Sequence, residues 1–515
     1  MNRRKFIQST TLAAAAVGTP VPWPQAVETD NQERRDIYQH VDSHQGDHLS
    51  KLQQYLRQPS ISSTGEGIME CADMVRRFMV DLKFTEVELV QTPGHPVVWG
   101  HYDAGARKTL VVYGMYDVVP IFRPELWEVP PFEARIVDKP ELGKALVARG
   151  TGNTKVPFRA FLNALGSILS VRDKLPINIM CVVEGEEELA SRNIGVAIEK
   201  HRDKLQTGDA CLDPKYLQNE QGLIELTLGA KGNTYIQLEC SNDRRRIGPP
   251  GGSSSRFSAL FGNPAWRLVE ALNTLVGNDG LDIKIDGYMD MHRLLPEDLE
   301  LIDAMLERYD PSVLLSDAKA IDFLPGLSKR DILIRYMLTP SFNISGIRSG
   351  FIDEDGRATR LPGKAFVKID CRTVPELDHN RIVPLVRAHL DKHGFQDISI
   401  RVFGSYPYFK TSVRNPQVQT LIQTYRNHGH EPLLLPLRSS SGPYGHHFTD
   451  SPLSLPFLYG GLGHAGHFHA PNEYVIIEGK GNLASLPEVE KFYVDLVYDF
   501  AAGPERPGKT GRTWV

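Results

Sequence analysis

Between residues 45 and 230, short and nearly uninterrupted apolar runs alternate with longer amphipathic segments. The periodicity predicts helices at 46–58, at 66–82, at 158–173 and from about residue 191. It predicts strands near 86–91, 96–101 and 109–114, and another that ends at Gly185. Strands without alternating polar residues are buried on both faces. We therefore expect an α/β fold with a mainly parallel central sheet flanked by helices.

The pattern changes near residue 229, where "TYIQLECS" alternates polar and apolar residues like an antiparallel strand. The Pro/Gly/Ser-rich stretch "IGPPGGSSSRFSALFG" follows, and Asn263 with Pro264 is typical of a helix start. A chain of 515 residues is too long for one hydrophobic core. We expect an inserted α+β lid or dimerisation domain at 229–408 and a catalytic α/β domain at 31–228 and 409–503.

The N-terminus carries Arg3 and Arg4 ahead of a mild apolar run to about Gly18. Twin arginines before such a run are typical of a Tat-type export signal. We expect residues 1–30 to be this signal, and the mature protein to be periplasmic or otherwise extracytoplasmic. The run is too short for a permanent membrane anchor. A net charge of −5 gives no basic footprint for nucleic acid.

Polar side chains gather where the predicted core strands end. The segments are "GMYDVVP" at 114–120, "ARGTGNTKVP" at 148–157, "EGEEELAS" at 184–191, "DACLDP" at 209–214 and "GHFHAPNE" at 466–473. Loops that follow parallel strands converge on one crevice. Adjacent carboxylates directly after a buried strand are costly unless a cation or a proton compensates them. These segments therefore predict one active site.

The same motifs resemble the zinc metallopeptidase superfamily of aminoacylase, carnosinase and succinyl-diaminopimelate desuccinylase, and within it the carnosinase-like dipeptidase branch. "GNPAW", "TPSFNISGI", "LPGKAFVKIDCRTVPELD" and "HAPNEYVIIEGK" extend the resemblance over nearly all of residues 40–500. The resemblance implies two zinc ions bridged by an aspartate and a water, with a glutamate as general base. Because the inserted domain dimerises in many relatives, it also implies a homodimer.

Transferred residue by residue, the resemblance makes Glu187 the general base and Asp117 the catalytic aspartate that in the family orients a metal-binding histidine. It makes Glu188, Asp213 and His469 metal ligands. Two ligand positions are lost, since Met115 stands where the family has histidine and Asn153 where it has the bridging aspartate. A neutral amide cannot hold two dications together. We therefore expect one zinc or other divalent cation at most, or none.

Substrate contacts are expected from the lid and from the resumed half of the catalytic domain. Arg372 matches a position that binds a substrate carboxylate, and "RSSSGPYG" takes the place of a glycine-rich substrate loop. The candidate substrate-binding residues are Arg372, Asn153, Lys155, Arg438, Ser440 and Tyr444. The family's oxyanion-stabilising histidine is absent from "RRRIGPPGGSSS". A new copper site that combines Met115 with His446, His447, His464 or His467 is a further alternative.

Three functions follow from these residues. The first is an exported amidohydrolase acting on an amide bond of a small peptide or N-acyl amino acid derivative. The second is a metal-independent acid/base enzyme that uses Glu187 for cyclisation, isomerisation or acyl transfer, because metal-bound hydroxide is hard to generate without the bridge. The third is a non-catalytic periplasmic binder of a peptide-like ligand. The retained run Glu186–Glu188 argues against the third.

Overall fold

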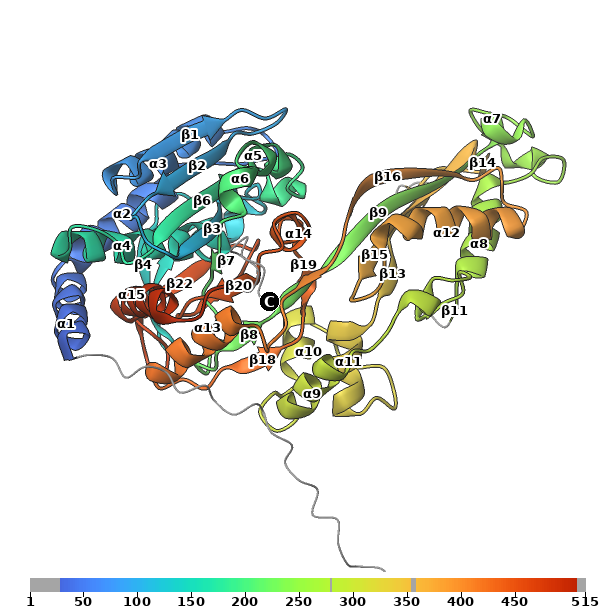
Figure 1. Cartoon of the computed structure of the whole chain (residues 1–515). Helices are drawn as coiled ribbons and strands as arrows, with labels where there is room; N and C mark the ends of the chain where they lie inside the picture. The colour runs from blue at the N-terminus through green and yellow to red at the C-terminus, as the bar shows by residue number, and fades with distance from the viewer. Residues whose placement is uncertain (1–27, 278–279, 353–357, 507–515) are drawn as a thin grey trace, which may run out of the picture.

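The computed structural model describes residues 28–277, 280–352 and 358–506. Two lobes are visible in Figure 1, and the long strand β9 (Gly229–Ser241) runs from one to the other. The expected export signal lies almost wholly in residues 1–27, outside the described part. Within the described residues, no helix combines the length and the apolar character needed to cross a membrane.

The first lobe is built on a six-stranded sheet of order β1-β2-β6-β3-β7-β20. Strands β3, β6, β7 and β20 run parallel, whereas β1 and β2 add antiparallel at one edge. The bounds are β1 (Glu86–Val90), β2 (Val97–Tyr102), β3 (Thr109–Met115), β6 (Asn178–Glu184), β7 (Ala210–Pro214) and β20 (Phe457–Gly460). The α/β expectation with a mainly parallel sheet is confirmed. The hairpin β1–β2 is antiparallel because its connection is too short for a crossover.

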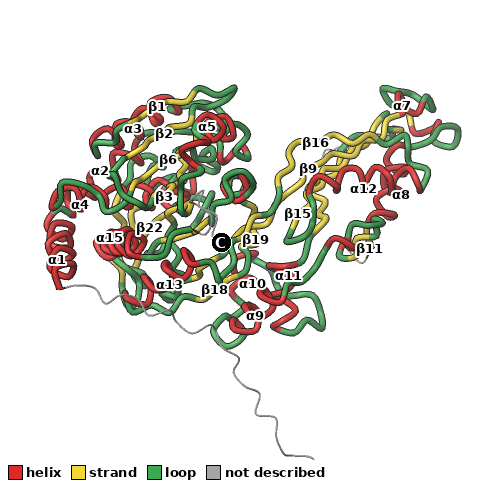
Figure 2. Tube along the Cα trace, in the orientation of Figure 1, coloured by secondary structure: helices red, strands yellow, loops and turns green. Residues whose placement is uncertain are grey.

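Helices cover both faces of this sheet (Figures 1 and 2). On one face α4 and α15 are buried along most of their length, which explains why α4 is apolar on nearly every side. That face carries α1 (Glu28–Ser43), α2 (Gln45–Arg57), α3 (Ile68–Asp81), α4 (Val156–Val171), α13 (Pro416–Asn427) and α15 (Leu486–Ala502). The other face carries α5 (Ile194–Lys200), α6 (Arg202–Leu205) and α14 (His446–Thr449).

A separate antiparallel sheet of order β21-β22-β5-β4 lies in the same lobe. Its strands are β4 (Arg135–Lys139), β5 (Gly143–Val147), β21 (Ala465–Gly466) and β22 (Tyr474–Gly479). The sequence pattern predicts that the segment 148–157 follows a strand of the central sheet. In the structure it follows β5 of this separate sheet, so that prediction is wrong. Tyr474 pairs with Val147. This register places residues 148–153 beside the loop at 467–473.

The second lobe is an antiparallel sheet of order β13-β15-β9-β16, with helices on one face. Alternate residues of β9 and β15 are buried there, as the alternating pattern predicted. The elements are β13 (Ser341–Ser349), β15 (Lys364–Thr373), β16 (Ser399–Tyr406), α8 (Pro264–Leu275) and α12 (His379–Lys392). The Asn263 side chain accepts from the N–H of Ala265, which confirms it as the cap of α8.

Strand β9 belongs to both lobes, because its first residues pair with β17 (Phe409–Lys410) and β19 (Arg438–Ser441). Helices α9 (Pro296–Met305) and α11 (Lys329–Leu338), with α10 (Val313–Ala318) between them in sequence, fall in the expected insert. However, α9 and α11 share a small core with β18 (Leu433–Leu435), which pairs with β8 (Glu225–Thr227) of the first lobe. This core joins the two lobes at the base of β9.

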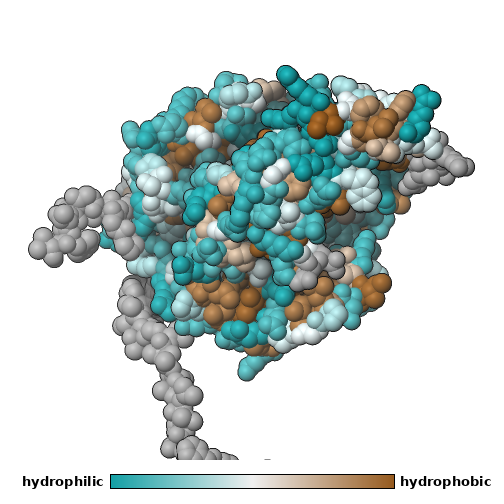
Figure 3. Space-filling model, turned by 90° about the vertical axis from the view of Figure 1, so that its right-hand side faces the viewer, coloured by the Kyte–Doolittle hydropathy of each residue, from teal (hydrophilic) through white to brown (hydrophobic). Residues whose placement is uncertain are grey.

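Short elements complete the second lobe: α7 (Asn242–Arg245), β10 (Ser253–Ser254), β11 (Val276–Gly277), β12 (Asp282–Ile283) and β14 (Arg360–Leu361). Figure 3 looks onto this side of the molecule, where apolar patches lie among polar ones. Exposed apolar side chains of the lobe include Trp266, Leu260 and Ile347. All five cysteines are buried free thiols, as their scattered spacing indicated.

Candidate active site

Acidic side chains lie at the carboxyl ends of three neighbouring parallel strands. Asp117 follows β3, and Glu187 and Glu188 follow β6. Asp213 lies near the end of β7. Because β3 lies between β6 and β7, their loops meet at one edge of the sheet. The second sheet brings in the turn that contains Asn153, so the chain assembles one site from four strands.

Asp117 holds the acidic turn in place. Its carboxylate is fully buried and accepts from the backbone N–H of Glu187 at 3.2 Å and of Glu188 at 3.1 Å. Burial raises the pKa of Asp117, and the charges of Glu187 and Glu188 raise it further. A methionine at position 115 offers Asp117 no ring N–H to accept from. Asp117 instead accepts from the backbone of Glu187 and Glu188, and it thereby fixes the position of the acidic turn.

Glu187 is half-buried at the mouth of the site. Burial, together with the neighbouring Glu188, raises its pKa to about 7. The positive charges of Lys215, Arg438 and His469 act in the opposite direction. A carboxylate with these surroundings suits proton transfer near neutral pH, because it exchanges a proton readily in either direction.

Asn153, Glu188 and His469 form a hydrogen-bonded triangle. The Asn153 amide nitrogen lies 2.9 Å from Glu188 Oε1 and 2.9 Å from His469 Nε2. His469 Nε2 is itself 2.9 Å from Glu188 Oε1. The hydrogen bond with Glu188 raises the pKa of His469. The structure thus brings together three residues that are up to 316 positions apart in sequence.

A buried ion pair supports this triangle from below. Arg149 Nη1 lies 2.7 Å from Glu473 Oε2, and both side chains are 1% exposed. Glu473 also accepts from the N–H groups of Gly150, Gly152 and Asn153 at 3.0–3.1 Å. Burial raises the pKa of Glu473, and Arg149 opposes that shift. Both residues lie inside the motifs at 148–157 and 466–473, but nothing in these motifs predicts that the two side chains pair.

Asp213 has a different set of neighbours. Its Oδ2 accepts from the Tyr444 hydroxyl at 2.9 Å and lies 3.4 Å from Lys215 Nζ. Its Oδ1 is buried without a hydrogen-bond partner. Tyr444 is buried and stacks on Tyr113 with ring centroids 4.0 Å apart. The sequence predicts that Tyr444 contacts the substrate. In the structure its side chain is buried and its hydroxyl donates to Asp213.

Arg372 of β15 crosses from the second lobe to the first. Its Nη1 donates to Ser441 Oγ at 2.7 Å, and the Tyr406 hydroxyl donates to the same oxygen at 2.9 Å. Ser440, the serine chosen from sequence, is exposed, and its neighbour Ser441 makes these contacts. Strand alternation could have separated the two serines only if the register of β19 were known.

Lys155 does not face the glutamates. Its side chain is fully buried, and Nζ donates to the carbonyl oxygens of Gln58 at 2.8 Å and Tyr55 at 3.5 Å. Burial lowers its pKa. The ammonium therefore closes the end of α2 and offers a substrate no exposed contact, contrary to the expectation from sequence.

The additional histidines do not gather around Met115. His464 bonds to the Gln218 carbonyl and the Tyr474 hydroxyl, and His467 bonds to the Pro471 carbonyl. Burial lowers the pKa of His446 to about 3 and that of His447 to about 4. Within the described ranges, no group of three or more His, Cys, Asp or Glu side chains could hold a metal ion. The copper alternative therefore has no support.

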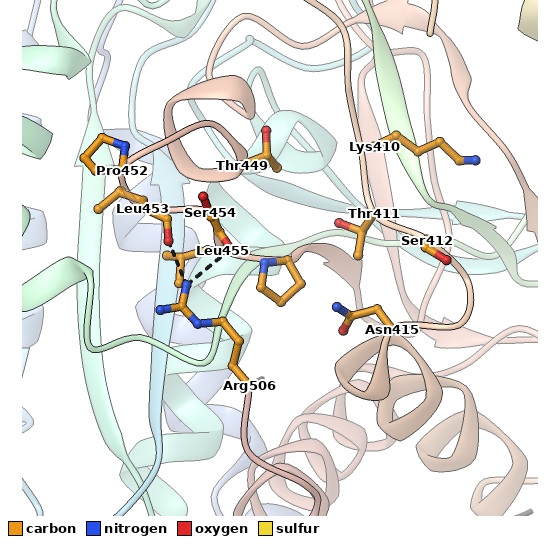
Figure 4. A pocket seen from close by; sticks show the side chains of 11 residues that line it. Lys410, Thr411, Ser412, Asn415, Thr449, Pro452, Leu453, Ser454, Leu455 and Arg506 are labelled. Atoms are coloured by element: carbon orange, nitrogen blue, oxygen red, sulfur yellow. Dashed lines mark hydrogen bonds between the residues drawn. The ribbon is translucent and has the colours of Figure 1, made fainter. Parts of the chain in front are cut away.

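A pocket of about 530 Å³ lies elsewhere in the first lobe, and Figure 4 shows its lining. Arg506 enters it and donates to the carbonyl oxygens of Leu453 at 2.7 Å and Ser454 at 3.2 Å. Thr411 and Asn415 line the opposite side. None of the candidate site residues lies in it.

Comparison with known proteins agrees with this architecture. Residues 111–499 match the profile of Peptidase family M20/M25/M40. The chain is 26% identical over 375 residues to the Beta-Ala-His dipeptidase of Homo sapiens, covering 69% of this chain and 71% of that one. It is 26% identical over 377 residues to the Cys-Gly metallodipeptidase of Saccharomyces cerevisiae, covering 69% and 75%.

Solved structures of peptidases resemble this fold. An M20 family metallo-carboxypeptidase from Sulfolobus solfataricus superposes with a TM-score of 0.76 at 29% identity, over 88% of this chain and 98% of that one. Human carnosine dipeptidase 1 shares the fold, with a TM-score of 0.73 at 22% identity over 93% and 100% of the two chains. The chain is a member of peptidase family M20/M25/M40, a family of hydrolases that includes metal-dependent dipeptidases.

Proposed function

We propose that this protein is an exported amidohydrolase that cleaves an amide bond of a small peptide or N-acyl amino acid derivative, with at most one metal ion. The observation that carries the proposal is Glu187, whose turn Asp117 holds through the backbone and whose pKa is raised by burial against the opposing positive charges of Lys215, Arg438 and His469. The Beta-Ala-His and Cys-Gly dipeptidases among the relatives support a dipeptide-sized substrate. The metal-independent and non-catalytic alternatives gain no specific observation.

The chemistry follows from the position of Glu187. Its carboxylate accepts a proton from a water molecule as the water oxygen attacks the amide carbonyl carbon. The same proton then passes to the amide nitrogen as the C–N bond breaks, which gives a carboxylic acid and a free amine. The acid then loses its proton to the amine or to solvent. Arg372, oriented by its hydrogen bond to Ser441, is the residue that would bind a substrate carboxylate.

The donor atoms do not fit a pair of zinc ions. Catalytic zinc sites take three protein ligands, usually His and carboxylate. Next to Asn153 only Glu188 and His469 are of this kind, and the amide nitrogen of Asn153 faces both of them. At Asp213 the carboxylate contacts the Tyr444 hydroxyl and the ammonium of Lys215. No catalytic step is therefore assigned to a metal.

The metal content can be measured directly. Protein purified without chelators is expected to contain no more than one equivalent of zinc, or of another divalent ion, per chain. The reason is that neither Asn153 nor Met115 supplies the anionic or imidazole donor that a second ion requires. Elemental analysis by mass spectrometry gives the stoichiometry. Two equivalents of tightly held zinc would contradict the proposal.

Ser441 offers a test of substrate binding. We expect Ser441→Ala to raise KM by about tenfold or more with little change in kcat, because loss of a hydrogen bond to a charged group costs roughly 1.5–3 kcal/mol. The assay is release of free amine from a panel of dipeptides and N-acyl amino acids. Ser440→Ala, next in the chain and exposed, is the matched control. Equal KM values for the two variants would refute this role.

Export and dimerisation complete the proposal. The twin arginines support transport in the folded state, so the buried free cysteines need not form disulfides on arrival. Exposed apolar side chains on the edge strand β13, Ile344 at 42% and Ile347 at 55%, support pairing of two second lobes. We propose a periplasmic homodimer.

A further inference from the structure

The acidic site contains an internal pair of cations that the family resemblance did not indicate. Lys215 directly follows β7, and its Nζ lies 3.4 Å from Asp213 Oδ2. The Lys215 N–H donates to the Gly460 carbonyl at 3.0 Å, which extends the β7–β20 ladder. Its side chain is 12% exposed and Asp213 is 1% exposed, so water screens the pair little.

Arg438 supplies the second charge from a separate strand. Its guanidinium lies over the ring of Tyr459 at 5.0 Å, and Tyr459 is the residue opposite Asp213 in the β7–β20 ladder. Nη2 donates to the Ser441 carbonyl at 3.2 Å, whereas the buried Nε has no hydrogen-bond partner. The guanidinium therefore lies on Tyr459, whose hydroxyl is 3.4 Å from the Tyr444 hydroxyl that donates to Asp213.

These cations offset negative charge without an ion. Lys215 forms an ion pair with the buried Asp213, and Arg438 adds a second positive charge near the carboxylates of the site. Met115, fully buried at the end of β3, adds none. In a standard family site a dication and a histidine would occupy this region. Here a dication next to Asp213 would lie close to two like charges at low effective dielectric, where repulsion is strong.

We propose that Lys215 and Arg438 replace one of the two family metal ions, so that positive charge is supplied to Asp213 without it. The inference deepens the proposed function. Its catalytic part rests on that function: the two cations would stabilise the negative charge that develops on the substrate carbonyl oxygen. The exclusion of a metal ion at this position can be tested without turnover.

The test restores the missing ligand with and without the blocking charge. Met115→His is compared with Met115→His/Lys215→Met by isothermal titration with zinc chloride alone and by the zinc-dependent shift in Tm. We expect Met115→His to bind no more zinc than the wild type, because both cations remain. The double variant is expected to bind one additional equivalent per chain and to show a higher Tm in zinc.

Lys410 provides a matched control, because it is equally buried at 10% exposure and also pairs with a buried aspartate, Asp298. Met115→His/Lys410→Met should bind zinc like Met115→His. If the Lys215 variant does not fold, Met115→His/Arg438→Met tests the same inference by removing the other cation. An extra equivalent in Met115→His alone, or none in the variants that lack a site cation, would overturn the inference. Neither result depends on whether the protein hydrolyses amides.

Discussion

Replacing Glu187 by glutamine is expected to lower kcat for amide hydrolysis by about 10²–10⁴-fold, the usual contribution of a general base. Glutamine has nearly the same shape but cannot accept the proton of the attacking water. The backbone N–H of residue 187 still donates to Asp117, so the acidic turn keeps its position. The measurement is steady-state kinetics on the best dipeptide found in the substrate panel, with KM expected to change little.

Glu186→Gln is the matched control for this substitution. Glu186 is adjacent and buried, but its carboxylate accepts from the Asn193 amide at 2.6 Å and belongs to the packing of the turn. Its kcat should stay within a few-fold of the wild type. If Glu187→Gln retained wild-type kcat, Glu187 would not be the base. If no substrate were turned over and Glu187→Gln bound ligand as the wild type does, the non-catalytic alternative would be favoured.

Removing the carboxylate of Glu473 should destabilise the protein more than removing a carboxylate from a surface ion pair. We expect Glu473→Ala to lower the free energy of unfolding by about 3–5 kcal/mol, because it leaves a buried charge on Arg149 unpaired. Three backbone N–H groups of the Asn153 turn lose their acceptor as well. Denaturant unfolding followed by circular dichroism measures the change. Activity should fall too, because that turn positions Asn153 against Glu188 and His469.

An exposed ion pair between the adjacent strands β22 and β5 gives the control. Glu478 lies 2.8 Å from Lys144, and the two side chains are 63% and 47% exposed. Glu478→Ala should change the free energy of unfolding by no more than about 1 kcal/mol, as is usual for surface pairs. Arg149→Leu/Glu473→Leu should recover part of the stability lost in Glu473→Ala, since no buried charge remains. Equal losses in Glu473→Ala and Glu478→Ala would show that the buried pair is not a support.

Much of the architecture could be predicted because it depends on local patterns. Continuous apolar runs gave β3, β6 and β7, and alternation gave β9 and β15. Each pattern indicates which faces of a segment are buried, and the pattern can be read from a few consecutive residues. The same reasoning failed for the segment at 148–157, because an apolar run does not reveal which sheet a strand joins.

The sequence by itself determined the family and the strand ends that carry the acidic residues. Only the tertiary structure decided that Lys215 pairs with Asp213, and that Arg149 pairs with Glu473 from 324 positions away. Such contacts depend on strand register and on the packing of two sheets, which fix where long side chains end. Residue type states the available charge, whereas the fold decides which opposite charge it meets.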